Sequence, residues 1–318
     1  MKNIFTKYLM LPILIFSCSN ESIDIEIEPN NPQLKNYIFR TYNVTTSPNT
    51  IILERSFNLD DDRIINSTNT SSLTTDETTA EYEYSNNRIS RISQYINGTI
   101  VSIKNFSYNV NGNLIEYQKE NIDNSQSSFY TKIVFTHTAD TIFGVSKGSQ
   151  DGINFDTDLA TTKIVLDANK NKTYQEIYTF NNNQTSYTNY TYDSNNNMII
   201  SNEFKDLNGT FFPTLSFTYA YESTINTLGK IYEETFGRAT LMLLNQHREL
   251  NTSAINYYNA KYIATNCFES VTTNFFGNSL SAEFESDSNS ENYSTYSNYS
   301  TLDSGSLIAR FSYDYIFE

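Results

Sequence analysis

The chain has 318 residues, with 36 acidic and 21 basic side chains and a formal net charge of −15. Such an acidic surface repels phosphate backbones, so we expect no nucleic-acid partner. The sequence contains 25 Tyr, 21 Phe and no Trp, but only 10 Gly and 5 Pro, and asparagine is frequent. Aromatic and β-branched residues favour strands and Asn favours turns, so the composition predicts an all-β fold.

The first 20 residues have the pattern of an export signal. Residues 8–16 form an apolar run, which is shorter than the roughly 20 residues that span a bilayer but has the length of a signal-peptide core. Ser17 directly precedes Cys18, and Ile15 lies three positions before this cysteine. The arrangement resembles the lipobox of bacterial lipoproteins, which implies that residues 1–17 are a cleaved signal peptide. The alternative is an ordinary secretory signal with an incidental cysteine.

The lipobox resemblance also implies a membrane anchor. Cys18 would become the first residue of the mature protein and carry a thioether-linked diacylglycerol, and two or more acyl chains anchor a protein stably. Residues 18–36 are predicted to be a lipidated flexible tether, because Pro29 and Pro32 flank two asparagines and interrupt regular structure. Ser19 to Ser22 loosely match an acidic surface-export signal of Bacteroidetes lipoproteins. We therefore expect attachment to the outer membrane, with exposure at the cell surface as an open alternative.

The rest of the chain, residues 37–318, is predicted to be a single β domain. Apolar and polar residues alternate along 106–110, 215–221 and 307–317. A period of two residues indicates strands with one buried face, as in antiparallel sheets. Without Lys2 and Lys7 of the signal, the mature chain from residue 18 to residue 318 has 19 basic residues against 36 acidic ones.

A local motif recurs along this domain. It reads Tyr-x-Tyr-Ser-Asn-Asn at 82–87, Phe-x-Tyr-Asn-x-Asn-Gly at 106–112 and Tyr-x-Tyr-Asp-x-Asn-Asn at 190–196, with a degenerate copy at 164–172. Each copy consists of an aromatic strand, a turn rich in Asn or Gly and a second apolar strand, which together predict a β-hairpin. Repetition predicts an antiparallel up-and-down meander of hairpins, curled or closed into a barrel-like sheet.

The motif resembles the YD repeat of Rhs-type and teneurin-type proteins. Together with the lipobox and a final aromatic strand at 311–315, it more closely resembles a group of Bacteroidetes lipoproteins of unknown function. The resemblance extends over residues 80–318 and implies a porin-like antiparallel sheet. The self-cleaving core of Rhs proteins has no counterpart here, so the resemblance implies neither encapsulation nor autoproteolysis.

Residues 238–250 depart from the strand pattern. Leu241 and Leu244, with His247, have helical spacing, and Gly237 precedes the segment. We predict a short helix or structured loop that covers one mouth of the barrel or one sheet edge. A simple connecting role is the alternative.

Reactive side chains are scarce. Apart from Cys18 the only cysteine is Cys267, in a strand-like stretch, and the only histidines are His137 and His247. We predict a buried, inert thiol at Cys267, a sheet-face histidine with a hydrogen-bonded partner at position 137, and an exposed His247. These residues cannot form a usual zinc site, and no phosphate-binding loop is present. We therefore expect no enzyme activity, no metal and no cofactor.

Two short polar motifs have simpler interpretations. The run Asp60-Asp61-Asp62 lacks the alternating register of a calcium loop, so we predict a polar hairpin turn rather than a metal site. The sequence Asp140-Thr141-Ile142 resembles the short O-glycosylation sequon of Bacteroidetes, although three-residue matches are common by chance.

The expected function is that of a non-enzymatic cell-envelope lipoprotein, a surface-binding or structural module with a glycan or protein ligand. The alternative is a carrier that holds an apolar or glycan ligand within a β-barrel cavity, and a hydrolase is the third hypothesis. The aromatic residues are expected to form the core and cross-strand ladders rather than a sugar-stacking platform. A well-lined cavity open to solvent would favour the carrier, and an interior filled by Tyr and Phe would exclude it. Two facing carboxylates in a cleft would favour the hydrolase.

Overall fold

The computed structural model describes residues 33–45, 48–122, 129–244, 260–275, 278–303 and 306–318. Residues Gln33–Glu318 form one compact unit. The predicted signal peptide, Cys18 and nearly all of the predicted tether lie outside the described residues, as does His247. Among the described residues, no helix has the length and apolar character needed to cross a membrane.

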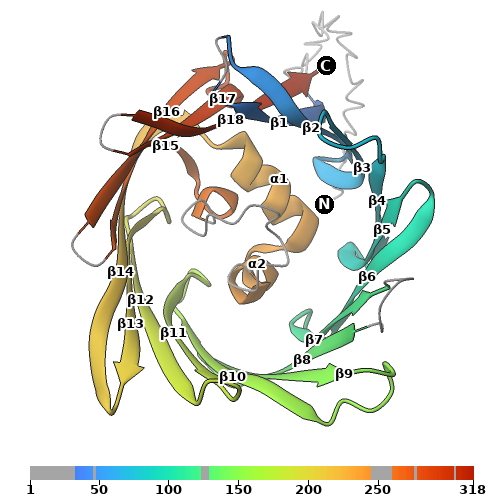
Figure 1. Cartoon of the computed structure of the whole chain (residues 1–318), viewed down its shortest axis with the longest axis vertical. Helices are drawn as coiled ribbons and strands as arrows, with labels where there is room; N and C mark the ends of the chain where they lie inside the picture. Colours follow the sequence, from blue (N-terminus) through green and yellow to red (C-terminus); the bar gives the residue numbers. More distant parts are fainter. Residues whose placement is uncertain (1–32, 46–47, 123–128, 245–259, 276–277, 304–305) are drawn as a thin grey trace, which may run out of the picture. The chain divides into compact units, whose positions relative to one another are not determined.

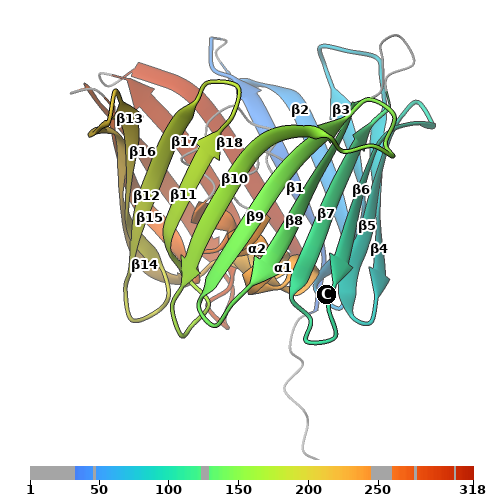
Figure 2. The same cartoon turned by 90° about the horizontal axis from the view of Figure 1, so that it is seen from below.

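A single 18-stranded antiparallel sheet closes on itself to form a barrel, because β18 pairs with β1 (Figures 1 and 2). Each other strand pairs with its neighbours in the chain, which confirms the predicted meander of hairpins. The strands are β1 (Leu34–Asn43), β2 (Thr50–Asp60), β3 (Arg63–Ser71), β4 (Thr78–Ser85), β5 (Arg88–Ile96), β6 (Thr99–Tyr108), β7 (Leu114–Asn121), β8 (Phe129–His137), β9 (Thr141–Ser149), β10 (Thr157–Leu166), β11 (Lys172–Thr179), β12 (Gln184–Tyr192), β13 (Met198–Leu207), β14 (Thr210–Ile225), β15 (Asn266–Phe275), β16 (Asn278–Ser288), β17 (Ser294–Asp303) and β18 (Ser306–Phe317).

In the repeated hairpin motif, the Asp or Asn that follows the aromatic strand holds the turn together with its side chain. Asp193 Oδ1 accepts hydrogen bonds from the backbone N–H groups of Asn195 and Asn197, at 2.8 and 2.9 Å. Short side chains of this kind fold a turn by replacing a backbone acceptor. Asn196, the third residue after Asp193, has a φ of +65°, in the region that Asn tolerates better than most residues. The same arrangement recurs around Asn109, Asp167 and Asn289.

The last aromatic residue of each copy of the repeat motif forms a hydrogen bond to the backbone of a neighbouring hairpin. Tyr192 Oη donates a hydrogen bond to the carbonyl of Lys172, the first residue of β11, at 3.1 Å. His137 Nε2 contacts the carbonyl of Leu114, the first residue of β7, at 2.7 Å. His137 therefore takes the place of the repeat tyrosine, and the predicted hydrogen-bonded partner is present. The other bonds of this type are Tyr84 to Ile64 and Tyr221 to Met198.

Two helices, α1 (Thr227–Phe236) and α2 (Arg238–Leu244), lie inside the ring and near one of its ends (Figures 1 and 2). We predicted a short helix or structured loop over 238–250, at one mouth of the barrel or at a sheet edge. Its described part is helical through Leu244 and lies inside the ring near one end of the barrel, not over a sheet edge. A closed barrel has no free edge to cover. Helix α1 was not predicted.

The helices are part of the apolar core. Leu228, Ile231 and Leu244 are fully buried and belong to the same cluster as the inward aromatic residues of the strands. Thr235 Oγ1 accepts a hydrogen bond from the backbone N–H of Ile64 at 3.1 Å, which ties α1 to β3. This end of the lumen is thus tightly packed, and we call it the helix end.

The outer face of the barrel carries ion pairs as well as exposed apolar side chains such as Val134, Phe143 and Val145. Arg40 alternates along β1 with Tyr37 and Phe39 of the core, so it points outward. Its guanidinium bonds to Glu54 on β2, with Nε to Oε2 at 2.7 Å, and to Asp314 on β18. Other outward ion pairs join Lys147 to Asp158 at 3.1 Å and Lys132 to Glu116 at 3.9 Å. The ion pairs on this face therefore link neighbouring strands.

Candidate functional site: a cavity inside the barrel

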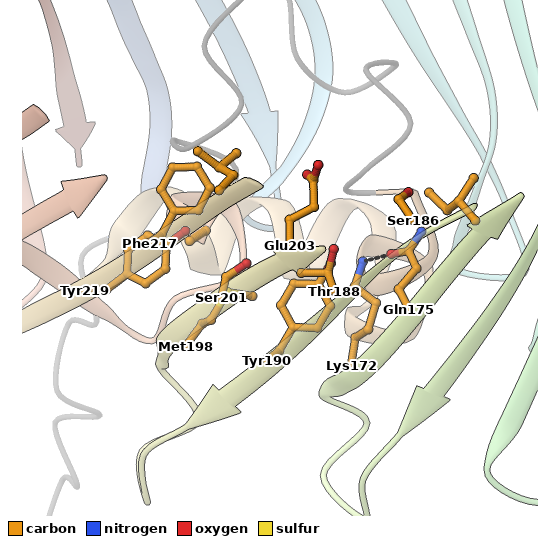
Figure 3. Close-up of a pocket in the computed structure, with 13 residues that line it drawn as sticks. Lys172, Gln175, Ser186, Thr188, Tyr190, Met198, Ser201, Glu203, Phe217 and Tyr219 are labelled. Carbon is orange, nitrogen blue, oxygen red and sulfur yellow. Dashed lines mark hydrogen bonds between the residues drawn. The ribbon is translucent and has the colours of Figure 1, made fainter. Parts of the chain in front are cut away.

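Strands β11, β12, β13 and β14 line a cavity of about 230 Å³ on their inner face (Figure 3). The solvent exposure of the lining side chains differs along the strands. We call the buried end of the cavity its floor and the more exposed end its mouth. At the floor, Lys172 and Gln175 are each 1% exposed. Further along, Ile177 and Ser186 are only partly buried, and the side chain of Glu203 is 30% exposed. The cavity therefore deepens from the solvent-accessible half of the lumen toward the helix end.

Lys172 provides a buried amine at the floor. Its Nζ donates a hydrogen bond to Gln175 Oε1 at 2.7 Å and lies 5.1 Å from the ring centroid of Tyr190 (Figure 3). No carboxylate is hydrogen-bonded to this amine within the described residues. Burial lowers the pKa of Lys172 to about 7, because removal from water penalises the ammonium form. The amine can therefore gain or lose a proton near neutral pH.

Two buried polar atoms of the cavity wall have no hydrogen-bond partner within the described residues: Gln175 Nε2 and Tyr190 Oη. Because Lys172 can only donate, Gln175 must offer its oxygen to the lysine, and its amide N–H groups remain available. A buried donor without an acceptor costs roughly 1–3 kcal/mol. The floor of the cavity is thus a cluster of donors that a bound acceptor would satisfy.

A carboxylate lies nearer the mouth. Glu203 Oε1 is 3.3 Å from Lys205 Nζ and accepts a hydrogen bond from Thr214 Oγ1 at 3.2 Å. Among the described residues that line the cavity, Glu203 is the acidic one, and it has no second carboxylate opposite. The paired carboxylates that would have favoured a hydrolase are not brought together in the described lining.

Acidic side chains of the strands lie mostly on the outer face of the barrel, whereas basic side chains lie on both faces. Lys104 alternates with buried Phe106 on β6 and pairs with Lys119 on β7, so both cations face the lumen. Arg55, Lys172 and Lys205 also point inward. Most strand acids point outward, and they are Glu54, Glu81, Glu83, Glu116, Glu120, Asp158, Glu176, Glu283, Glu285 and Asp314. The lumen is therefore less acidic than the net charge of the protein suggests.

A second buried lysine lies among aromatic rings. Lys261 is 5% exposed, and its Nζ donates a hydrogen bond to Tyr313 Oη at 2.6 Å. The same amine lies 4.9, 5.5 and 5.0 Å from the ring centroids of Tyr262, Tyr299 and Tyr313. Burial lowers the pKa of Lys261 to about 7 as well. Cation–π contacts and a hydrogen bond hold this lysine in the packed core.

Of the reactive or polar residues singled out in the sequence, those that the structure describes lie outside the cavity lining. Cys267 is buried, its Sγ is 3.8 Å from the carbonyl oxygen of Ile225, and burial raises the pKa of its thiol to about 11, which fits the predicted inert role. Asp61 and Asp62 form the turn between β2 and β3, and Asp62 pairs with Lys230 at 2.8 Å. Within the described ranges, no group of three His, Cys, Asp or Glu residues could hold a metal ion.

The cavity residues themselves were missed. Lys172 follows a turn in a polar stretch, where a lysine normally points to solvent. One signal was available: in the degenerate repeat at 164–172, lysine stands where Leu114 and Met198 stand in better copies. An apolar position of the repeat occupied by a cation marks a buried charge that needs an explanation.

Comparisons with known proteins give no family. No protein-family model matches the sequence, and no curated protein sequence matches it. Among solved structures, a porin-like protein from Bacteroides uniformis ATCC 8492 is 8% identical, with 90% of this chain and 98% of that chain covered and a TM-score of 0.45. A porin-like protein from Bacteroides vulgatus ATCC 8482 is 12% identical, with 91% and 99% covered and a TM-score of 0.40. Similarity at this level says nothing about a ligand or an activity of this chain.

Proposed function

We propose that the protein is a non-enzymatic binding protein of the cell envelope. In this proposal the lipid on Cys18 holds it at the outer membrane, the barrel stands in water, and the ligand binds inside the lumen. The observation that carries the proposal is the set of ion pairs on the outer face of the strands, opposite the buried aromatic core of the lumen.

A barrel that spans a bilayer has a continuous apolar band outside and a polar interior. Each Arg or Lys on the lipid face at the bilayer midplane costs about 2–4 kcal/mol. Arg40, Lys132 and Lys147 lie within strands and point outward, together with their acidic partners. This wall therefore favours water over lipid, and a membrane-bound barrel of this kind needs a separate anchor.

The distribution of interior residues supports binding within the barrel over a purely structural role. Tyr and Phe fill the helix end, where α1 and α2 pack against the strands. On the inner face of β11–β14, Tyr190, Phe217 and Tyr219 line a cavity of about 230 Å³ that they do not fill. Of the hypotheses drawn from the sequence, the geometry therefore favours the carrier with a ligand in its cavity.

Cell fractionation of a Cys18→Ser variant tests the proposal. The wild-type protein should remain with the outer membrane after an alkaline carbonate wash, and the variant should appear in the soluble fraction without detergent. Cys267→Ser, which removes the other cysteine, should fractionate as wild type does. A Cys18→Ser variant that stays in washed outer membranes with residues 1–17 removed would show that the barrel itself is inserted, and the proposal would fail.

A further inference from the structure

We infer that the cavity lined by β11–β14 binds a small acidic sugar, a monosaccharide-sized ring that carries a carboxylate. The inference rests on the proposed function, and it names the class of ligand for the same lumen.

The floor of the cavity favours a carboxylate. Lys172 Nζ, Gln175 Nε2 and Tyr190 Oη are buried there, and the last two have no partner within the described residues. All three can donate hydrogen bonds, and a carboxylate is an acceptor with about four lone-pair sites. Charge-assisted bonds of this kind are roughly twice as strong as neutral ones. An anionic oxygen pair at the floor would satisfy these donors together.

The field in the lumen also favours an anion. Lys104, Lys119, Lys205 and Arg55 face inward together with Lys172, whereas the acids of the same strands mostly point outward. Glu203, the acid of the cavity lining, is itself 3.3 Å from Lys205, so basic side chains remain in excess. An excess of one sign of charge between low-dielectric walls concentrates ligands of the opposite sign. An acidic protein can thus admit an anion to its interior because its own carboxylates are on the other side of the wall.

The walls above the floor suit a sugar ring. Tyr190, Phe217 and Tyr219 offer apolar ring surfaces, while Glu203 and Ser201 offer groups that can bond to hydroxyls (Figure 3). A purely apolar ligand would leave these polar groups and the floor donors without partners. The volume of about 230 Å³ lies below the roughly 300–1,000 Å³ of pockets for drug-sized ligands, which limits the ligand to one ring.

Isothermal titration calorimetry with glucuronate and glucose tests the inference on the full mature lipoprotein in detergent micelles. The two sugars share their ring and four hydroxyls and differ at C6, where glucuronate has a carboxylate and glucose a hydroxymethyl group. We expect saturable binding of glucuronate and affinity for glucose weaker by about tenfold or more, the effect of a charged hydrogen bond. Equal affinities, or no saturable binding of glucuronate, would overturn the inference.

Variants locate the binding site. Lys172→Met should reduce the affinity for glucuronate by about tenfold or more and leave the weak affinity for glucose nearly unchanged. Gln175→Leu should act in the same direction, and it serves if Lys172→Met does not fold. The matched control is Lys163→Met, which removes a lysine from the outer face of β10 and should leave both affinities unchanged.

The two failures are distinguishable. If Lys163→Met weakens binding as much as Lys172→Met does, the sugar binds through the general field of the protein and the site assignment falls. A barrel that is released by Cys18→Ser but binds neither sugar retains the proposed function and loses only the acidic-sugar ligand. A barrel that stays in the membrane loses the proposed function itself.

Discussion

Two lysines are buried in the same lumen, and they differ only in their surroundings. Lys261 at the helix end bonds to Tyr313 and lies close to the rings of three tyrosines. Lys172 on β11 bonds to Gln175, beside a cavity whose wall contains two donors without partners. Burial lowers both pKa values to about 7. A perturbed pKa therefore does not identify the binding residue, whereas the space and the unsatisfied groups around it do.

The contrast extends to packing. At the helix end, α1 and α2 fill the lumen and bury most of their apolar side chains, including Leu228, Ile231 and Leu244. Along β11–β14 the same kind of strand faces open space. One barrel thus contains a region that provides stability and a region that can admit a ligand.

Truncation of one leucine in each region should give the largest difference in stability between the packed helix end and the cavity wall. Leu228→Ala in α1 removes a side chain with no exposed surface, and we expect a loss of about 2–5 kcal/mol in the free energy of unfolding. Leu215→Ala, at the partly exposed wall of the cavity, should cost less than about 2 kcal/mol because part of its side chain already meets open space. Urea denaturation measures both. Equal losses would contradict the division into a packed and an open region.

The two lysines should respond alike to pH. In the unfolded chain the pKa of lysine is about 10.4, and in the folded protein it is about 7 for both residues. Between these values the unfolded chain binds more protons, so the folded state gains stability as the pH rises. Each lysine contributes a slope of up to about 1.4 kcal/mol per pH unit, and below pH 7 its destabilising effect is fully present and constant.

Lys172→Met and Lys261→Met should therefore each flatten the pH dependence of the unfolding free energy between pH 7.5 and 9. Chemical denaturation at several pH values measures this slope, and Lys163→Met on the outer face is the control. Only Lys172→Met should also weaken the binding of glucuronate. If neither variant changes the slope, the two amines are not held in their neutral form by burial.

The hydroxyl groups of two tyrosines differ in hydrogen bonding, and we expect a smaller difference in stability from their removal. Tyr221 Oη donates a hydrogen bond to the carbonyl of Met198 at 2.7 Å, whereas Tyr190 Oη has no partner among the described residues. Tyr221→Phe should cost about 1 kcal/mol, the net value of one hydrogen bond. Tyr190→Phe should leave the melting temperature unchanged or slightly higher, and should weaken glucuronate binding. A loss of stability on Tyr190→Phe equal to that of Tyr221→Phe would show that its hydroxyl is already satisfied.

Local features of the sequence determined the hairpins. The two-residue alternation at 215–221 and the turns led by Asn109 and Asp193 depend on residues close together in the chain. They predicted antiparallel hairpins, and the described strands confirm them. The polar turn at Asp60–Asp62 was equally local and equally predictable.

Only the tertiary structure decided closure, the inner helix and the cavity. The pairing of Phe39 with Tyr313 joins strands from opposite ends of the chain, and no local pattern specifies it. Alternation reveals that a strand has two faces, but it does not reveal that one of them encloses a lumen. Lys172 lies in a polar stretch that would be exposed on an open sheet, and it is buried inside the closed barrel beside Gln175 and Tyr190. Burial depends on the whole barrel, and burial is what gives this lysine its chemistry.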